Sequence, residues 1–156
     1  VDGYESNNSR PGRRITDTSD CDDPNSHQLL ASLYSSGDVD YYYFHASDNT
    51  GCNLYPQAAL ANIPANTDYD LIAYWRCADG SNPKSFRCVS GTAVAGYGCA
   101  STNPGNASEY VEIDACCTSF AGINCTGDDH GYLDVYVYKF SGTATCQNYS
   151  LYWGDN

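Results

Sequence analysis

Oxygen-bearing side chains gather in two short segments of this sequence. The first segment, near the start, carries one carboxylate and two amides, and the second carries two carboxylates separated by one residue. Alternate residues of an extended chain point the same way, so Asp38 and Asp40 can face the same ion. Calcium takes about six to eight hard oxygen ligands, and carboxylates and amides from two segments can supply them. We therefore predict that these segments can supply calcium ligands, and the candidate ligands are Glu5, Asn7, Asn8, Asp38 and Asp40.

The alternative is that these side chains are simply solvated. Glu5, Asn7 and Asn8 would then belong to a polar arm, and Asp38 would be a turn residue beside Gly37. A solvated loop is the prediction for the other groups of acidic residues, which are Asp20, Asp22, Asp23, Asp68, Asp70, Asp128 and Asp129.

Composition points to the exterior of the cell. Nine cysteines in 156 residues indicate an oxidising compartment, because cytosolic reductants would leave so many thiols free and reactive. The chain contains no Met, and apolar stretches such as 71–75 are far too short to cross a bilayer. We expect a secreted, extracellular protein whose signal segment has been removed. A formal charge of -12 makes cations natural partners and argues against nucleic acid and anionic membranes.

The odd number of cysteines leaves at least one thiol outside any internal disulfide. We predict four internal disulfides and one buried thiol, with a bridge to another chain as the alternative. Cys77 and Cys88 flank a plausible hairpin turn and are the best candidates for a local pair. Cys116 and Cys117 leave a strand on opposite faces, which predicts two different partners, although a strained vicinal disulfide is the alternative. The candidate disulfide cysteines are Cys21, Cys52, Cys77, Cys88, Cys99, Cys116, Cys117, Cys125 and Cys146.

The elements that must position these groups are β-strands. The chain has 15 Tyr and 2 Trp, while Gly, Asn, Asp, Ser and Pro interrupt it about every ten residues. No long helical face and no internal repeat occurs. This predicts an all-β fold, a two-sheet antiparallel β-sandwich that is jelly-roll-like and stapled by disulfides. About eight strands are predicted, at residues 29–34, 40–45, 52–60, 69–75, 85–90, 110–115, 132–138 and 147–153.

One domain is the expectation at this length. Residues 1–24 are predicted to form a polar N-terminal arm with the metal-binding turn, and residues 25–156 to form the sandwich. Within the sandwich, the Gly-, Ala- and Ser-rich stretch 91–106 is predicted to be a long surface loop tied down by Cys99.

Four segments follow one another in an order typical of a known family. The chain opens with DGYESNN (2–8), continues with SLYSSGDVDYYYF (32–44) and TDYDLIAY (67–74), and closes with GYLDVYVY (131–138) followed by YSL (149–151). These segments, which span nearly the whole chain, resemble bacterial pre-peptidase C-terminal domains, relatives of the collagen-binding domains of collagenases. Ser6 stands where that family usually has Pro.

The resemblance implies a secreted β-sandwich in which an ion joins the two oxygen-rich segments. Such domains are usually appended to proteases or other hydrolases, and some bind calcium and polymers such as collagen. This chain departs from the family pattern in its many cysteines, and no catalytic domain is expected within these 156 residues beside the sandwich.

Catalytic signatures are absent from the sequence. It has no G-x-S-x-G elbow, no H-E-x-x-H motif and no phosphate-binding loop. Zinc is not predicted, because His27, His45 and His130 are scattered. Asp129 beside His130 is explained as well by a charged loop as by acid/base chemistry. Carboxylate pairs among the 19 acidic residues leave an acidic hydrolase as a remote alternative to a non-catalytic protein.

Surface contacts are then the expected mode of action. Tyr41, Tyr42 and Tyr43 must present rings on both faces of a strand, and at least one ring is predicted to lie outside the core. Such a ring would stack on a sugar or contact another subunit, and the alternative is a cross-strand ladder on an ordinary solvent face. Glycosylation is possible at four N-x-S/T sequences, unless they arise by chance; they begin at Asn7, Asn106, Asn124 and Asn148.

The function predicted from these features is that of a calcium-binding extracellular structural subunit. It would self-associate into a fibre or surface layer. In one alternative calcium at Glu5 pins the arm within its own domain, and in the other the arm of one subunit lies across a sheet edge of the next. The alternative is an adhesion module that binds collagen or polysaccharide for a secreted hydrolase system.

Overall fold

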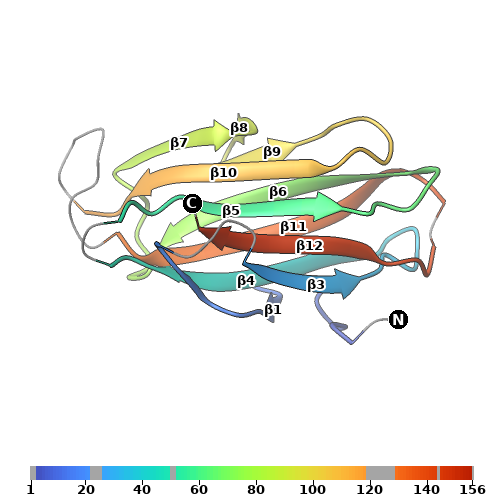
Figure 1. Ribbon diagram of the computed structural model, residues 1–156, viewed down its shortest axis with the longest axis horizontal. Helices are drawn as coiled ribbons and strands as arrows, with labels where there is room; N and C mark the ends of the chain where they lie inside the picture. The colour runs from blue at the N-terminus through green and yellow to red at the C-terminus, as the bar shows by residue number, and fades with distance from the viewer. Residues whose placement is uncertain (1–2, 22–25, 50–51, 119–128, 144, 156) are drawn as a thin grey trace.

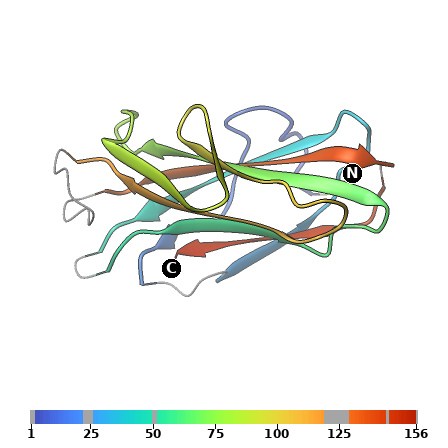
Figure 2. The same ribbon diagram turned by 90° about the horizontal axis from the view of Figure 1, so that it is seen from above.

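The computed structural model describes residues 3–21, 26–49, 52–118, 129–143 and 145–155. Within these ranges the regular secondary structure consists of β-strands alone, which confirms the predicted all-β class. The strands form two sheets, one of seven strands and one of five, that pack together as a sandwich. Figure 1 shows the smaller sheet lying across the larger one, and Figure 2 shows the two layers from above.

The larger sheet comprises β1 (Arg13–Arg14), β2 (Thr18–Ser19), β4 (Val39–Ser47), β6 (Thr67–Cys77), β8 (Thr92–Val94), β9 (Gly98–Ser101) and β11 (Gly131–Gly142). The smaller sheet comprises β3 (His27–Ala31), β5 (Pro56–Ala61), β7 (Ser85–Ser90), β10 (Glu109–Cys116) and β12 (Tyr149–Asp155). The eight predicted strands correspond to β3 through β7 and β10 through β12.

The order of strands is β1-β4-β11-β6-β9-β8 in the larger sheet, with β2 also beside β4, and β3-β12-β5-β10-β7 in the smaller one. Neighbouring strands run antiparallel, except that β1 and β2 run parallel to β4. The longest strands, β6 and β11, lie side by side, and β4 pairs with the other edge of β11. This arrangement places β4 between the body of the larger sheet and the N-terminal arm.

The stretch 91–106 is not the long surface loop that its composition predicts. It contains β8 and β9, and β9 extends the larger sheet by pairing with β6. Ala, Gly and Ser have weak strand preferences, but small residues let two backbones approach closely. At Gly98 a Cβ would lie 2.6 Å from the ring of Tyr74, so the close contact with β6 requires glycine.

Side chains of β4 alternate between the core and the outer face of the sheet. Four of those that point inward are 0% exposed, namely Asp40, Tyr42, Phe44 and Ala46. They pack with apolar side chains from both sheets, and each fully buried Leu or Val contributes about 1.5–3 kcal/mol. A carboxylate at the end of this apolar row is costly unless its charge is compensated.

The N-terminal arm follows the outer edge of β4 in its own chain. Arg13 and Arg14 of β1 lie opposite Tyr42 and Tyr43, and β2 pairs with the end of β4. Closer to the N-terminus, the amide of Tyr41 donates a hydrogen bond to the backbone oxygen of Asn7 over 2.9 Å. The polar arm is thereby held against the larger sheet from Asn7 onward.

Three disulfides join described residues: Cys21–Cys52, Cys77–Cys117 and Cys88–Cys99. The second connects the end of β6 to the residue after β10, and the third connects β7 to β9. Both therefore tie the larger sheet to the smaller one. The last bond confirms that Cys99 tethers the segment that follows β7. Disulfides of this kind indicate an oxidising environment.

The predicted local pair of Cys77 and Cys88 is wrong. β6 and β7 do not form a hairpin, because β7 pairs with β10 in the other sheet, so the two cysteines have different partners. The bond between Cys77 and Cys117 also excludes a vicinal disulfide, and Cys116 is disulfide-bonded as well. Among the described cysteines the free thiol is that of Cys146, which is exposed rather than buried as predicted. Cys125 lies outside the described residues.

Candidate metal centre

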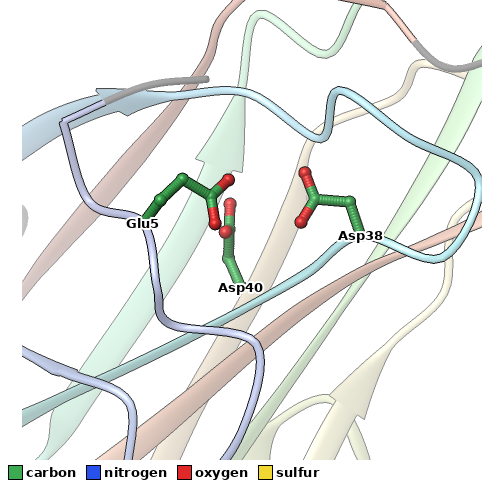
Figure 3. A group of neighbouring side chains, drawn as sticks. All are labelled: Glu5, Asp38 and Asp40. Carbon is green, nitrogen blue, oxygen red and sulfur yellow. The ribbon is translucent and has the colours of Figure 1, made fainter.

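Three carboxylates from two distant segments meet beside the start of β4 (Figure 3). Glu5 comes from the arm, Asp38 from the turn before β4, and Asp40 from β4 itself. One oxygen from each lies within 4.8 Å of the others. The side chains of Asp38 and Asp40 are buried and that of Glu5 is half-buried. The fold thus brings together the two oxygen-rich segments of the sequence.

The turn before β4 fixes the position of Asp38. Its Oδ2 accepts a hydrogen bond from the amide of Tyr34 over 2.8 Å. Its own amide donates to the oxygen of Ser35 over 3.3 Å, which closes the turn. These two hydrogen bonds hold the carboxylate of Asp38 in position beside the arm without the help of an ion.

The two amides of the first segment have different surroundings. Asn7 is 1% exposed, and neither amide atom of its side chain has a hydrogen-bond partner among the described residues. Coordination of a cation by its oxygen would satisfy one of these atoms. Asn8 is exposed, and with its nitrogen turned toward Asp38 it donates to Oδ1 over 3.1 Å and to the oxygen of Val39 over 2.7 Å. In that orientation the amide nitrogen of Asn8 supports Asp38, one of the candidate ligands.

Electrostatics favour a cation between the three carboxylates. Two like charges about 5 Å apart repel by about 3 kcal/mol at an effective dielectric constant of about 20. A divalent ion placed among them replaces this repulsion with attraction and offsets the cost of burying Asp38 and Asp40. Because carboxylate and amide oxygens are the donors, a hard ion such as calcium or magnesium suits the site better than zinc.

Asp40 also contacts a group of buried tyrosines. Its Oδ2 accepts a hydrogen bond from the hydroxyl of Tyr149 over 2.5 Å, and that hydroxyl lies 3.0 Å from the hydroxyl of Tyr42. Burial, together with Tyr42 and Asp40, raises the pKa of Tyr149 well above its usual 10. Burial and then Asp40 raise the pKa of Tyr69 to about 12. Both phenols are therefore neutral at ordinary pH, and that of Tyr149 donates its proton to Asp40.

A second acidic group was missed, because Asp20 and Asp129 are not solvated as predicted. Asp20 is 0% exposed and Asp129 is 4% exposed. Oδ1 of Asp20 accepts a hydrogen bond from the amide of Asn49 over 2.6 Å. Asp48 lies within hydrogen-bonding reach of both buried carboxyls, and burial followed by the charge of Asp48 raises the pKa of Asp129 to about 8. Asp48 continues the inward row of β4, so alternation along the strand could have indicated this group.

The remaining acidic groups also differ from the prediction where the structure describes them. Asp68 and Asp70 lie in β6 and not in a loop, and Asp70 is 3% exposed. Burial raises the pKa of Asp70, while a hydrogen bond from Tyr138 lowers it. Asp22, Asp23 and Asp128 lie outside the described residues.

Two histidines that are far apart in the sequence are neighbours in the fold. The ring centroids of His45 on β4 and His130 before β11 are 5.6 Å apart, because these strands pair. The third, His27, stacks on Trp153 with a centroid distance of 5.5 Å. Among the described residues, three or more potential metal ligands come together only at Glu5, Asp38 and Asp40, and no histidine belongs to that group.

The outer face of β4 carries an aromatic ladder. The ring of Tyr41 stacks on that of Tyr136, its cross-strand partner, with centroids 4.5 Å apart. The centroids of Tyr43 and Tyr132 are 6.4 Å apart. Tyr42, one of the three candidate contact residues, does not belong to this surface, because strand alternation places it in the core at 0% exposure, as rings on both faces of the strand require.

The structure restricts the predicted glycosylation positions. Asn7 is buried, so the folded chain cannot carry a glycan there. Asn106 and Asn148 are exposed, and Asn148 precedes β12 instead of lying within a strand as predicted. Asn124 lies outside the described residues.

Comparison with known proteins yields no match, either to a protein-family model or to a curated protein. The resemblance to bacterial pre-peptidase C-terminal domains therefore stays a prediction that rests on the four sequence segments. In the described part of the chain, no helix has the length and apolar character needed to cross a membrane.

Proposed function

We propose that this chain is a non-catalytic, secreted β-sandwich that binds calcium through Glu5, Asp38 and Asp40 and serves as a self-associating structural subunit. The observation that carries the proposal is the convergence of three carboxylates, two of them buried, to within 4.8 Å. Secretion is supported by the three disulfides among described residues. Calcium is preferred to magnesium because it tolerates an irregular set of ligands from two segments.

The ion would act as a clasp for the N-terminal arm. β1 and β2 comprise two residues each, and pairs of such short strands form few hydrogen bonds. Glu5 lies on the arm, whereas Asp38 and Asp40 lie at the start of β4. An ion bound by all three links the arm to the edge of the larger sheet and supplies stability that the short strands lack.

Release of the arm would expose β4 as a sheet edge. Exposed edges pair readily with strands of other chains, so the arm of one subunit can cover β4 of the next. The same site would then be completed between subunits, with Glu5 from one and Asp38 and Asp40 from the other. Repetition of this head-to-tail contact builds an open fibre, in which calcium locks each junction.

Electron microscopy and size-exclusion chromatography in calcium and in EGTA test self-association. The wild-type protein should form assemblies in calcium that dissociate in EGTA, and Glu5→Gln should remain monomeric in both. A matched control is Asp79→Asn, which removes one exposed acidic charge in the turn after β6 and should assemble normally. A wild-type protein that stays monomeric under every condition contradicts this role.

Polymer binding is the second candidate, and the aromatic ladder on the outer face of β4 favours it. Tyr41, Tyr43 and Tyr132 are half-buried and offer a broad contact area at small entropic cost. Pull-down on collagen and on insoluble polysaccharides measures it, with Tyr43→Ala as the test variant. Leu30→Ala, at an exposed position on β3, is the control. Retention that is equal for both variants excludes the ladder as the binding surface.

A further inference from the structure

A chain of phenolic hydroxyls leads from Asp40 into the core of the sandwich. The hydroxyl of Tyr149 lies 2.5 Å from Oδ2 of Asp40, and the hydroxyl of Tyr42 lies 3.0 Å from that of Tyr149. All three side chains are 0% exposed. Tyr149 begins β12, which lies between β3 and β5 in the smaller sheet, whereas Asp40 and Tyr42 belong to the larger sheet. The hydrogen bonds therefore cross the interface between the two sheets.

The donor in each of these hydrogen bonds is fixed by chemistry. An ionised carboxylate only accepts hydrogen bonds, so Tyr149 donates to Asp40. A phenol has a single proton to donate, so the oxygen of Tyr149 accepts from Tyr42. The ring of Tyr149 also packs edge-on against Tyr69, with centroids 6.0 Å apart, which holds its hydroxyl in place. A bond to an ionised acceptor is stronger than one between neutral groups.

We propose that Tyr149 is a positioning residue of the calcium site, which holds Oδ2 of Asp40 so that Oδ1 coordinates the ion. This inference rests on the proposed binding of calcium by Asp40 and its two neighbours. With Oδ2 engaged by the phenol, Asp40 acts as a ligand through one oxygen. Hydrogen bonds that orient metal ligands typically change metal affinity by about 10- to 100-fold when they are removed.

The same hydrogen bond couples the ion to the smaller sheet. Calcium contacts the arm through Glu5 and reaches β12 through Asp40 and Tyr149. Because the coupling between linked events is reciprocal, an ion that binds more tightly when this hydrogen bond is formed also stabilises the bond. Amides of β12, a strand that contributes no ligand, should therefore exchange with solvent more slowly when calcium is bound.

Two isosteric variants test the positioning role. Tyr149→Phe and Tyr42→Phe each remove one hydroxyl from a fully buried ring, but only the first removes the donor to Asp40. Calorimetric titration with calcium should show affinity about tenfold weaker for Tyr149→Phe and changed less than about threefold for Tyr42→Phe. Thermal unfolding in EGTA measures the structural cost, which should be larger for Tyr149→Phe, because that variant loses two hydrogen bonds and Tyr42→Phe loses one. A calcium affinity for Tyr149→Phe equal to that of the wild type overturns the inference.

The outcomes separate this inference from the proposed function. A wild-type protein that binds no calcium contradicts both, whereas binding that is indifferent to Tyr149→Phe contradicts only the positioning role. If Tyr149→Phe does not fold, hydrogen exchange of the wild type decides the matter. Slower exchange of β12 amides in calcium than in EGTA supports the coupling, and equal exchange refutes it.

Discussion

Buried carboxylates are stable in a fold only where their charge is neutralised or strongly hydrogen-bonded. Asp40 receives a hydrogen bond from Tyr149, and we propose that a cation shared with Glu5 neutralises it. Asp129, near the other end of β4, instead retains a proton, because burial and the charge of Asp48 raise its pKa to about 8. On this proposal, two acidic groups at the ends of one strand are balanced differently, one by an ion and the other by a proton.

Replacement of Asp129 with Asn is expected to change the pH dependence of stability. The folded-state pKa of Asp129 is raised from 3.8 to about 8. Its contribution is therefore complete below about pH 4 and is lost as the pH rises through about 8. Between about pH 6 and pH 9 the wild type should lose about 1–2 kcal/mol more stability than the variant. Denaturant unfolding of both proteins in EGTA measures this, and identical pH slopes would argue against it.

Part of the candidate site follows from local sequence and part does not. The spacing of Asp38 and Asp40 predicts a shared face, because side chains on a strand repeat every two residues. The approach of Glu5 depends on parallel pairing of the arm with β4, which no local pattern encodes. Only the family resemblance implied that an ion joins the two segments. Burial of Asp20 was missed because an acidic residue in a short polar segment has the pattern of a solvated turn.

At the scale of elements, the metal centre depends on how closely the arm approaches β4. Gly12, just before β1, has a φ of +81°, a conformation that favours glycine. A Cβ at this position would lie 2.2 Å from the backbone oxygen of Tyr41. The arm can follow β4 at this distance only because the residue has no side chain.

Gly12→Ala should therefore loosen the arm and weaken calcium binding without removing a ligand. We expect a loss of more than about 2 kcal/mol in unfolding free energy, from a strained φ and a steric clash together, and a clear loss of calcium affinity. The matched control is Gly80→Ala, whose φ of +78° is similar but whose Cβ would meet nothing within 4 Å. It should lose only about 1 kcal/mol and keep its calcium affinity. Equal effects of the two substitutions would show that the arm contact is unimportant.

The pattern of alternation, aromatic content and turn residues was sufficient to predict the eight longer strands. It failed for 92–94 and 98–101, whose small residues resemble a loop and which become strands through pairing with β6. It also suggested a hairpin between Cys77 and Cys88, although the chain crosses to the other sheet there. Which strands are connected across the two sheets depends on long-range packing, and the two-residue repeat of side chains along a strand does not predict it.

At the scale of the whole molecule, the two sheets are joined by covalent bonds as well as by the core. Cys77–Cys117 and Cys88–Cys99 each connect the larger sheet to the smaller one. A disulfide stabilises a fold mainly by restricting the unfolded chain. The sandwich should therefore keep its architecture without calcium, and loss of the ion should free mainly the arm.

Removal of the Cys88–Cys99 disulfide tests the covalent contribution. The double variant Cys88→Ser with Cys99→Ser should lose about 3 kcal/mol of unfolding free energy, because the bond closes a loop with a sequence separation of 11. Calcium affinity should be unchanged, since neither cysteine belongs to the metal centre. Cys146→Ser, which removes the exposed free thiol, is the control and should unfold like the wild type. A double variant as stable as this control would contradict the expectation.

Calorimetric titration with calcium tests the central claim most directly, because it measures whether Glu5, Asp38 and Asp40 hold an ion. The wild type and the Asp79→Asn control should bind with the same affinity, and Glu5→Gln and Asp38→Asn should each bind at least about tenfold more weakly. Absence of binding by the wild type, or undiminished binding by both ligand variants, would contradict the existence of a calcium site between the arm and β4.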